Sequence, residues 1–88
     1  MPLDYEKESE LLKALGHPIR LKIVGGLLSH ECNVNKMVKV LGIPQSTVSQ
    51  HLGILKSRGI VQIRKEGTKT CYRVKDARIG ELLKILKK

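Results

Sequence analysis

Uncharged polar side chains are concentrated in one short segment near the middle of the chain. The segment contains Gln45, Ser46, Thr47, Ser49, Gln50 and His51, interrupted by Val48. A glutamine can pair with both hydrogen-bonding groups of an adenine edge, and serine or threonine hydroxyls bond base edges or phosphates. An ordinary solvated helix face is usually richer in lysine and glutamate, because these residues form helices better than serine and threonine. The segment therefore predicts a helix that reads double-stranded DNA; the alternative is a helix face that is only capped and solvated.

Basic residues dominate the stretch after this segment. From Lys56 to Lys75 there are seven of them against one acidic residue, Glu66, whereas four of the eight acidic residues lie in the first ten positions. The seven are Lys56, Arg58, Arg64, Lys65, Lys69, Arg73 and Lys75. This distribution and the net charge of +9 favour a polyanionic partner. Arg64, Lys65 and Lys69 flank a predicted turn, where they would reach phosphates or a minor groove. The alternative is a solvated hairpin whose lysines discourage edge pairing.

Composition also argues against two kinds of partner. The chain has two tyrosines and neither phenylalanine nor tryptophan, whereas modules for single-stranded nucleic acid stack bases on aromatic side chains. The longest uncharged apolar stretch, Ile23 to Ser29, is too short to span a bilayer. The acidic N-terminal residues lack the apolar core of a signal peptide. We therefore expect a cytoplasmic protein that contacts no membrane.

Hydrophobic periodicity and helix-ending residues divide the chain into short elements. Helices are predicted over residues 4–15, from Pro18, over 35–41, over 45–58 and over 76–88, with strands over 60–64 and 70–74 joined by a turn over 65–68. A short helix, a break at Gly42 and a second helix form a helix-turn-helix, and the basic hairpin adds a wing. The predicted fold is mainly α with a small β-hairpin wing (α+β), a winged helix-turn-helix in the order α-α-α-α-β-β-α.

The terminal helices carry apolar residues that one small domain would leave exposed. A chain of 88 residues allows a single domain, which we predict to span residues 1–88. Such a domain buries a modest core, so dimerisation would stabilise it. Helically spaced leucines occur near both ends, at Leu11, Leu15, Leu82 and Leu86. We therefore expect a homodimer whose interface is formed by the helices at about residues 4–15 and 76–87.

Three segments resemble the ArsR/SmtB family of winged-helix repressors. Residues 15–23, Leu-Gly-His-Pro-Ile-Arg-Leu-Lys-Ile, are similar to that family's L-x-x-P-x-R-L-x-I opening. Residues 46–52, followed by Leu55 and by residues 59–61, look like its recognition helix, and residues 64–67 with Tyr72 look like its wing. The resemblance implies a homodimer that binds a two-fold symmetric operator, and repression that an inducer, a small molecule or a redox signal, relieves.

The resemblance also indicates where metal ligands would lie. Metal-sensing members often carry a C-x-C pair at the start of the third helix and an Asp-x-His pattern on the last helix. The matching positions here are Asn33 and Asn35, and Asp76 followed by Arg78. Asparagine and arginine do not replace the thiolates and imidazoles that such metals prefer, and the three histidines of the chain are dispersed. We therefore expect no metal site and no cofactor.

Two cysteines, Cys32 and Cys71, suggest a different kind of sensor. Cys32 precedes the third predicted helix, where winged-helix folds often place a short strand beside the wing, and Cys71 lies in the second wing strand. The two thiols are then neighbours, and we hypothesise a switch by disulfide, persulfide or soft-metal bridging. The alternative is that both are small buried apolar residues, the usual role of free cysteine.

Two other function classes compete with DNA binding. An enzyme is not expected, because no nucleophile–base pair, phosphate loop or metal cluster can be assembled from these residues. A winged-helix protein-interaction module is the stronger alternative. Its surface at the recognition helix should be apolar or acidic, whereas this segment is polar and flanked by basic residues.

Overall fold

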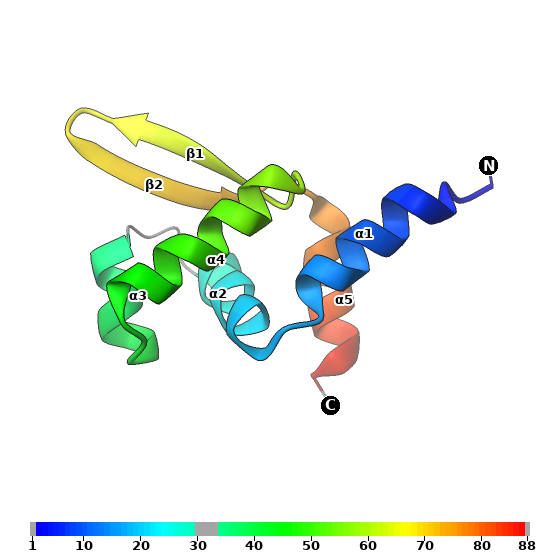
Figure 1. Ribbon diagram of the computed structural model, residues 1–88, viewed down its shortest axis with the longest axis horizontal. Coiled ribbons are helices and arrows are strands. Elements are labelled where there is room, and N and C mark those ends of the chain that lie inside the picture. The colour runs from blue at the N-terminus through cyan, green and yellow to red at the C-terminus, as the bar shows by residue number, and fades with distance from the viewer. Residues whose placement is uncertain (1, 30–33, 88) are drawn as a thin grey trace.

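The computed structural model describes residues 2–29 and 34–87, which form helices and a β-hairpin (Figure 1). In chain order the elements are α1 (Tyr5–Leu15), α2 (Pro18–Ser29), α3 (Val34–Leu41), α4 (Gln45–Ser57), β1 (Val61–Glu66), β2 (Lys69–Val74) and α5 (Ala77–Leu86). This order confirms the predicted winged helix-turn-helix. Among the described residues, no helix is long and apolar enough to cross a membrane.

Polar caps begin the first two helices. The carboxylate of Asp4 accepts a hydrogen bond from the backbone N–H of Lys7 at 3.1 Å, and Nδ1 of His17 accepts one from the backbone N–H of Ile19 at 3.1 Å. Each bond satisfies an amide that the first helical turn leaves without a partner. Pro18 takes the first position of α2, where a missing N–H is tolerated.

A glycine separates the two helices of the helix-turn-helix. Gly42 has a φ of 66°, in the left-handed region that favours glycine, and its N–H donates to the carbonyl of Val38 at 2.9 Å. Helix α4 then starts after Pro44. Both helices pack on α2 around a shared core, which includes Ile23, Val24, Leu27, Met37, Val48, Leu52 and Leu55.

The hairpin is longer in its strands and shorter in its turn than expected. Strands β1 and β2 pair in antiparallel register, from Val61 opposite Val74 to Glu66 opposite Lys69. The predicted turn over residues 65–68 is therefore wrong at its start, because the pairing continues to residue 66. Gly67, with a φ of 63°, and Thr68 close the hairpin. Figure 1 shows the hairpin projecting away from the helices as a wing.

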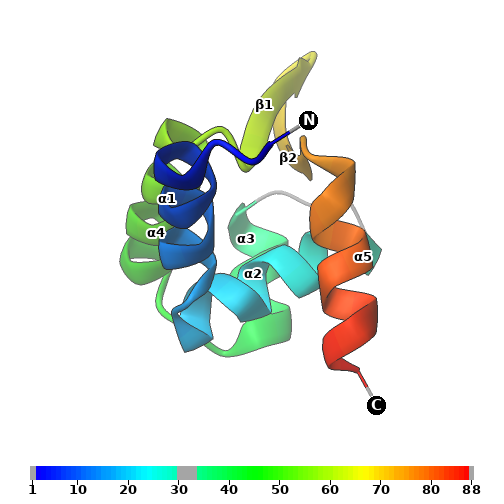
Figure 2. The same ribbon diagram turned by 90° about the vertical axis from the view of Figure 1, so that its right-hand side faces the viewer.

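Helix α5 completes the core from the side opposite to α4. Asp76 caps it by accepting a hydrogen bond from the backbone N–H of Arg78 at 2.9 Å. Ile79, on its inner face, is fully buried and belongs to the same core as the residues of α2 and α4. In Figure 2, α4 and α5 lie on opposite sides of α2. A surface built on α4 is therefore separate from one built on α5.

Candidate nucleic-acid interface

Helix α4 buries one face and exposes another that is uncharged and polar. Its buried residues, each at most 1% exposed, are Val48, Leu52 and Leu55. Its exposed polar residues in the first two turns are Gln45, Ser46, Ser49 and Gln50. Ser46 and Gln50 are four residues apart and so lie on the same face. Thr47 and His51 are half-buried, which places these two predicted contact residues at the edge of the polar face rather than at its centre.

The N-terminal end of α4 leaves backbone donors available. Pro44 occupies the capping position and makes no side-chain cap. Amides in the first turn of a helix have no partner within the helix, and the helix dipole adds positive charge at this end. Anions such as phosphate bind at helix ends of this kind. The start of α4 therefore suits the backbone of a nucleic acid.

The ring of His51 contacts two residues at the corner between α1 and α2. Its centroid is 4.6 Å from that of His17, with the ring planes inclined by 48°. Its Nδ1 lies 3.4 Å from Nη1 of Arg20, and Nε of Arg20 donates to the carbonyl oxygen of Ala14 at 2.6 Å. Burial lowers the pKa of His51, and His17 and Arg20 lower it further. The imidazole is therefore neutral at neutral pH.

The sequence alone predicts His51 on the interface but does not predict these partners. Arg20 is 31 residues away from His51, so no local spacing connects them. The one signal was that His17 and Arg20 belong to the opening segment of residues 15–23, which resembles a family motif. Only the packing of α4 against α2 brings the side chains together.

Two of the three predicted wing residues lie on opposite faces of the hairpin. Arg64 and Lys65 are exposed in β1, opposite Cys71 and Thr70 respectively. Neighbouring residues of a strand point to opposite faces, so Arg64 and Lys65 lie on different sides of the hairpin. Lys69 begins β2 directly after the turn. Arg64 and Lys65 thus face opposite sides of the hairpin, which suits phosphates on either side of an inserted wing better than one anion on one face.

Some of the basic side chains form ion pairs within the molecule. Nη1 of Arg58, at the end of α4, lies 3.3 Å from Oε2 of Glu10 in α1. Lys13 lies 3.6 Å from the other oxygen of the same carboxylate. These side chains are about half exposed or more, so each pair contributes little to stability. Arg58 nevertheless has an intramolecular partner, unlike a cation displayed for DNA alone.

Residues 17–62, from the cap of α2 to the beginning of β1, match a family model described as bacterial regulatory protein, arsR family. The chain belongs to this arsR family. It is 45% identical over 83 residues to an uncharacterized HTH-type transcriptional regulator of Methanocaldococcus jannaschii, a match that covers 93% of both chains. The family membership makes the chain a DNA-binding transcriptional regulator with a winged helix-turn-helix, as the sequence predicts.

Two solved structures of transcriptional regulators have the same fold as this chain. The crystal structure of the transcriptional repressor PagR of Bacillus anthracis matches with a TM-score of 0.88 and 36% identity, covering 94% of this chain and 95% of that one. A homodimeric winged helix-turn-helix DNA-binding domain from Mycobacterium bovis, solved in solution, matches with a TM-score of 0.84 and 30% identity. That match covers 94% of this chain and 77% of the other. The likeness therefore extends over all the elements from α1 to α5.

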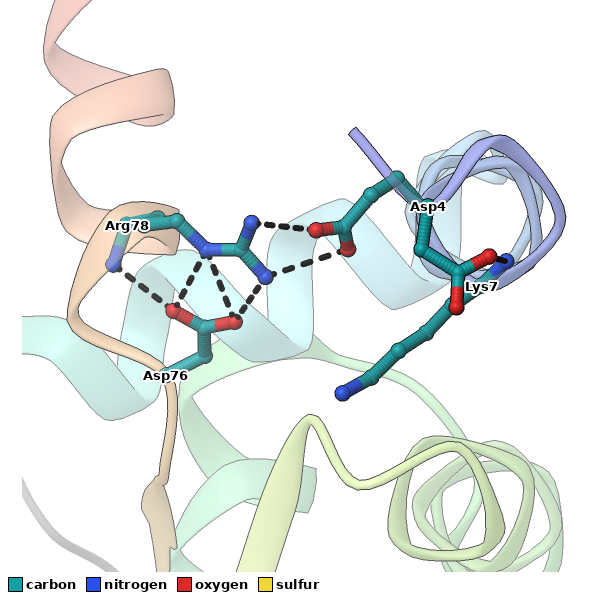
Figure 3. A network of polar contacts seen from close by, with 5 residues as sticks. Asp4, Lys7, Asp76 and Arg78 are labelled. Atoms are coloured by element: carbon teal, nitrogen blue, oxygen red, sulfur yellow. Dashed lines mark hydrogen bonds and ion pairs between the residues drawn. The ribbon is translucent and has the colours of Figure 1, made fainter. Parts of the chain in front are cut away.

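In this arsR-family chain, a guanidinium lies at the position where the resemblance suggests a metal ligand. Arg78 donates from Nε and Nη2 to the carboxylate of Asp76 at 3.1 and 2.7 Å, and from Nη1 and Nη2 to that of Glu8 at 2.6 and 3.2 Å (Figure 3). Hydrogen bonding to Arg78 lowers the pKa of both carboxyl groups and raises the pKa of Arg78 itself. Asp76 is thus engaged by a cation of the chain itself.

Two asparagines stand at the positions that match the C-x-C pair of metal-sensing family members, and one of them belongs to the described residues. Asn35 is exposed at the start of α3, whereas Asn33 lies outside the described residues. Among the residues that are described, no group of three or more His, Cys, Asp or Glu side chains is arranged to hold a metal. The expectation that the chain binds no metal remains a prediction.

Of the two cysteines in the thiol hypothesis, only Cys71 belongs to the described residues. Cys71 is a half-buried free cysteine in β2, on the same face of the hairpin as Arg64. Cys32 lies outside the described residues, so the predicted proximity of the two thiols stays a prediction. Oxidation of Cys71 would change a side chain on one of the two strands that form the wing.

An apolar surface extends along α1 and α5. Its most exposed members are Leu3, Leu12, Ile85 and Leu86, at 56–70% exposure. A groove between the two helices is lined by Leu3, Leu12 and Ile85 together with Leu11 and Leu82. Arg78, Glu8 and Glu81 form the polar border of the groove. Apolar patches with polar borders mark surfaces that another protein chain covers.

Proposed function

We propose that this protein is a repressor that binds a two-fold symmetric site in duplex DNA as a homodimer. The observation that carries the proposal is the exposed face of α4, where hydrogen-bonding side chains are uncharged and accessible. Such a face gains little from general attraction to phosphates and is suited to reading base edges in the major groove. We also propose that this regulator is cytoplasmic.

The interface divides into reading and anchoring residues. Residues at the centre of the polar face, Gln45, Ser46, Ser49 and Gln50, read base edges. Thr47 and His51, at its edge, contact the DNA backbone. Arg64, Lys65 and Lys69 bind phosphates beside the wing, because neutralising phosphates releases counterions and strengthens binding to any sequence.

The dimer uses the terminal helices, within residues 4–15 and 76–87. The exposed apolar groove between α1 and α5 supports this arrangement, and so does the homodimeric relative from Mycobacterium bovis. Since α5 lies opposite α4 in the fold, a dimer formed there leaves both reading surfaces accessible (Figure 2). The two α4 helices then contact successive major-groove segments about 34–36 Å apart, one turn of DNA.

The test begins by selecting bound duplexes from a random-sequence library with the purified chain. Affinity is then measured by fluorescence anisotropy for the selected duplex, a shuffled duplex of equal composition and a single strand. We expect the selected duplex to bind on the order of a thousandfold more tightly than the shuffled one. Placing the selected site at a promoter should lower transcription of a reporter gene when the protein is present.

Two results would contradict the proposal in different ways. Equal affinity for selected and shuffled duplexes would remove sequence specificity. No binding to any duplex at low salt would favour the alternative, a winged-helix module that binds proteins.

We also propose a thiol signal through Cys71 and Cys32, supported by the free, half-buried Cys71 in the wing. Operator affinity should fall after oxidation or persulfide treatment, and reduction should restore it. A Cys71→Ser variant should bind the operator as tightly as the wild type with reduced thiols does, both before and after the treatment. An operator affinity that is the same in reduced and treated wild type would contradict the switch.

A further inference from the structure

The neighbours of His51 determine which of its ring nitrogens carries the hydrogen. Arginine has donors and no acceptor, so Nδ1 of His51, 3.4 Å from Nη1 of Arg20, is the accepting atom. A neutral imidazole that accepts at Nδ1 has its hydrogen on Nε2. Burial first, and then His17 and Arg20, lower the pKa of His51 and so keep the ring neutral. Nε2 of His51 is therefore a hydrogen-bond donor.

The side chain of Arg20 is itself held in place by the chain around it. Its Nε donates to the carbonyl oxygen of Ala14 at 2.6 Å. In a continuing helix this carbonyl would accept from the N–H of residue 18, but Pro18 has none. The guanidinium thus supplies a donor that the proline lacks, at a residue that is only 4% exposed. This bond fixes Arg20 beneath α4.

His17 supports the ring of His51 from a second direction. Nδ1 of His17 accepts from the backbone N–H of Ile19 at the start of α2, which fixes the orientation of the His17 ring. The two imidazole centroids are 4.6 Å apart. His51 is therefore constrained by a hydrogen bond at Nδ1 and by ring packing. Its remaining polar atom, Nε2, has no partner among the described residues.

We propose that Arg20 is a positioning residue that holds His51 as a donor at Nε2, and that this donor binds a phosphate oxygen of the duplex. The proposal rests on the DNA-binding function proposed above. His51 lies at the half-buried edge of the polar face of α4, where a helix in the major groove meets the DNA backbone rather than base edges. A phosphate oxygen accepts hydrogen bonds and cannot donate them, so it requires the form of His51 with hydrogen on Nε2.

The first test measures the tautomer directly. Nitrogen chemical shifts of ¹⁵N-labelled wild-type protein at neutral pH should show His51 with its hydrogen on Nε2. In an Arg20→Met variant, which keeps an unbranched apolar stem and loses the guanidinium donors, both tautomers of His51 should be populated. Wild-type protein with the hydrogen on Nδ1 of His51 would overturn the proposal without any variant being made.

The second test replaces His51 with amides that mimic one nitrogen each. A glutamine carries an NH₂ at about the position of Nε2, and an asparagine carries one at about that of Nδ1. Relative to wild type, His51→Gln should keep duplex affinity within about threefold, whereas His51→Asn and His51→Ala should lose about tenfold, as for one hydrogen bond to a charged group. The loss should be the same for selected and shuffled duplexes, because every duplex has phosphates. A loss confined to the selected duplex would overturn the phosphate contact in favour of a base contact.

The third test separates positioning from simple structural support. Arg20→Met is measured in wild-type and in His51→Gln backgrounds, with folding checked by circular dichroism. If Arg20 acts through the imidazole, the substitution should lower affinity several-fold in the first background and leave it within about twofold in the second, where no tautomer has to be chosen. Equal losses in both backgrounds would overturn the proposal.

The outcomes distinguish this inference from the proposed function. A wild type that binds no duplex at all would overturn the proposed function together with the phosphate contact. A wild type that binds DNA specifically while His51→Asn binds as well as His51→Gln would overturn this inference alone.

Discussion

Arg78 in α5 donates two hydrogen bonds to Glu8 in α1, from Nη1 to Oε2 at 2.6 Å and from Nη2 to Oε1 at 3.2 Å. The two residues are 70 positions apart in the chain. The same guanidinium also binds Asp76, at the cap of its own helix. This contact links the two terminal helices within one subunit, beside the groove where we propose that a second subunit binds.

Acid should weaken this link between α1 and α5. Hydrogen bonding to Arg78 lowers the pKa of Glu8 and of Asp76 in the folded chain, so their stabilising effect is present at neutral pH and is lost as the pH falls from about 5 towards 2. An Arg78→Met variant should have a lower melting temperature than wild type at pH 7 and the same one near pH 2. Calorimetry at fixed protein concentration checks this.

The matched control for this prediction is Lys84→Met, which removes another exposed cation from α5. Its difference from wild type should change little across the acid range. A melting-temperature gap for Arg78→Met that stays constant from pH 7 to pH 2 would contradict the linkage.

Loss of a reading residue should reduce discrimination between DNA sequences. Gln50→Ala should weaken binding to the selected duplex by about 1–3 kcal/mol and leave the shuffled duplex almost unchanged, because a base contact is made with the correct base only. The control is Ser57→Ala on the same helix, where the hydroxyl donates to the carbonyl of Ile54 at 2.7 Å. Anisotropy titrations measure binding to both duplexes. An equal loss of affinity for the two duplexes in Gln50→Ala would refute the base contact of Gln50.

Loss of a wing cation should weaken binding to every duplex. Lys65→Ala should lower the affinity for selected and shuffled duplexes alike and reduce the slope of log affinity against log salt by about 0.9, as for one phosphate contact. Lys84→Ala, on α5, is the control with the same change of charge outside the hairpin. Identical salt slopes for Lys65→Ala and wild type would argue against a phosphate contact.

A charge in the apolar groove should separate the subunits. Ile85 is 66% exposed on α5 and lines the groove between α1 and α5. Ile85→Glu should give a folded monomer at micromolar concentration, because a carboxylate buried in an apolar interface has no partner. Val40→Glu is the control, since Val40 is equally apolar and 72% exposed but lies on α3. Sedimentation velocity would exclude this interface if Ile85→Glu remained dimeric.

Two glycines should respond to alanine in opposite directions. An added Cβ would meet no atom within 4 Å at Gly53 or at Gly42, but Gly42 has a φ of 66°. Gly53→Ala should stabilise the protein by about 1 kcal/mol through helix propensity, whereas Gly42→Ala should destabilise it by about 1–2 kcal/mol. Thermal unfolding measures both, and a destabilised Gly53→Ala would reveal a constraint in α4 other than space or backbone angle.

Local interactions made most of the fold predictable from the sequence. The helix caps at Asp4 and Asp76 and the turn at Gly42 depend on residues within a few positions of one another. The polar face of α4 follows from the 3.6-residue period, which also accounts for the burial of Val48, Leu52 and Leu55 on the opposite face. The end of β1, at residue 66 rather than 64, depended on how far the strands stay paired, which is set by both strands together.

The tertiary structure alone decided which charged and titratable groups meet. The pairs Arg20–His51, Arg58–Glu10 and Arg78–Glu8 each join residues on different helices, and no spacing along the chain links their members. A side chain finds such a partner only after apolar faces have packed the helices at a particular angle and depth. The sequence by itself therefore determined a winged helix-turn-helix with an uncharged polar face on α4. The packing of α4 on α2 and of α5 near α1 determined the state of His51 and the partner of Arg78.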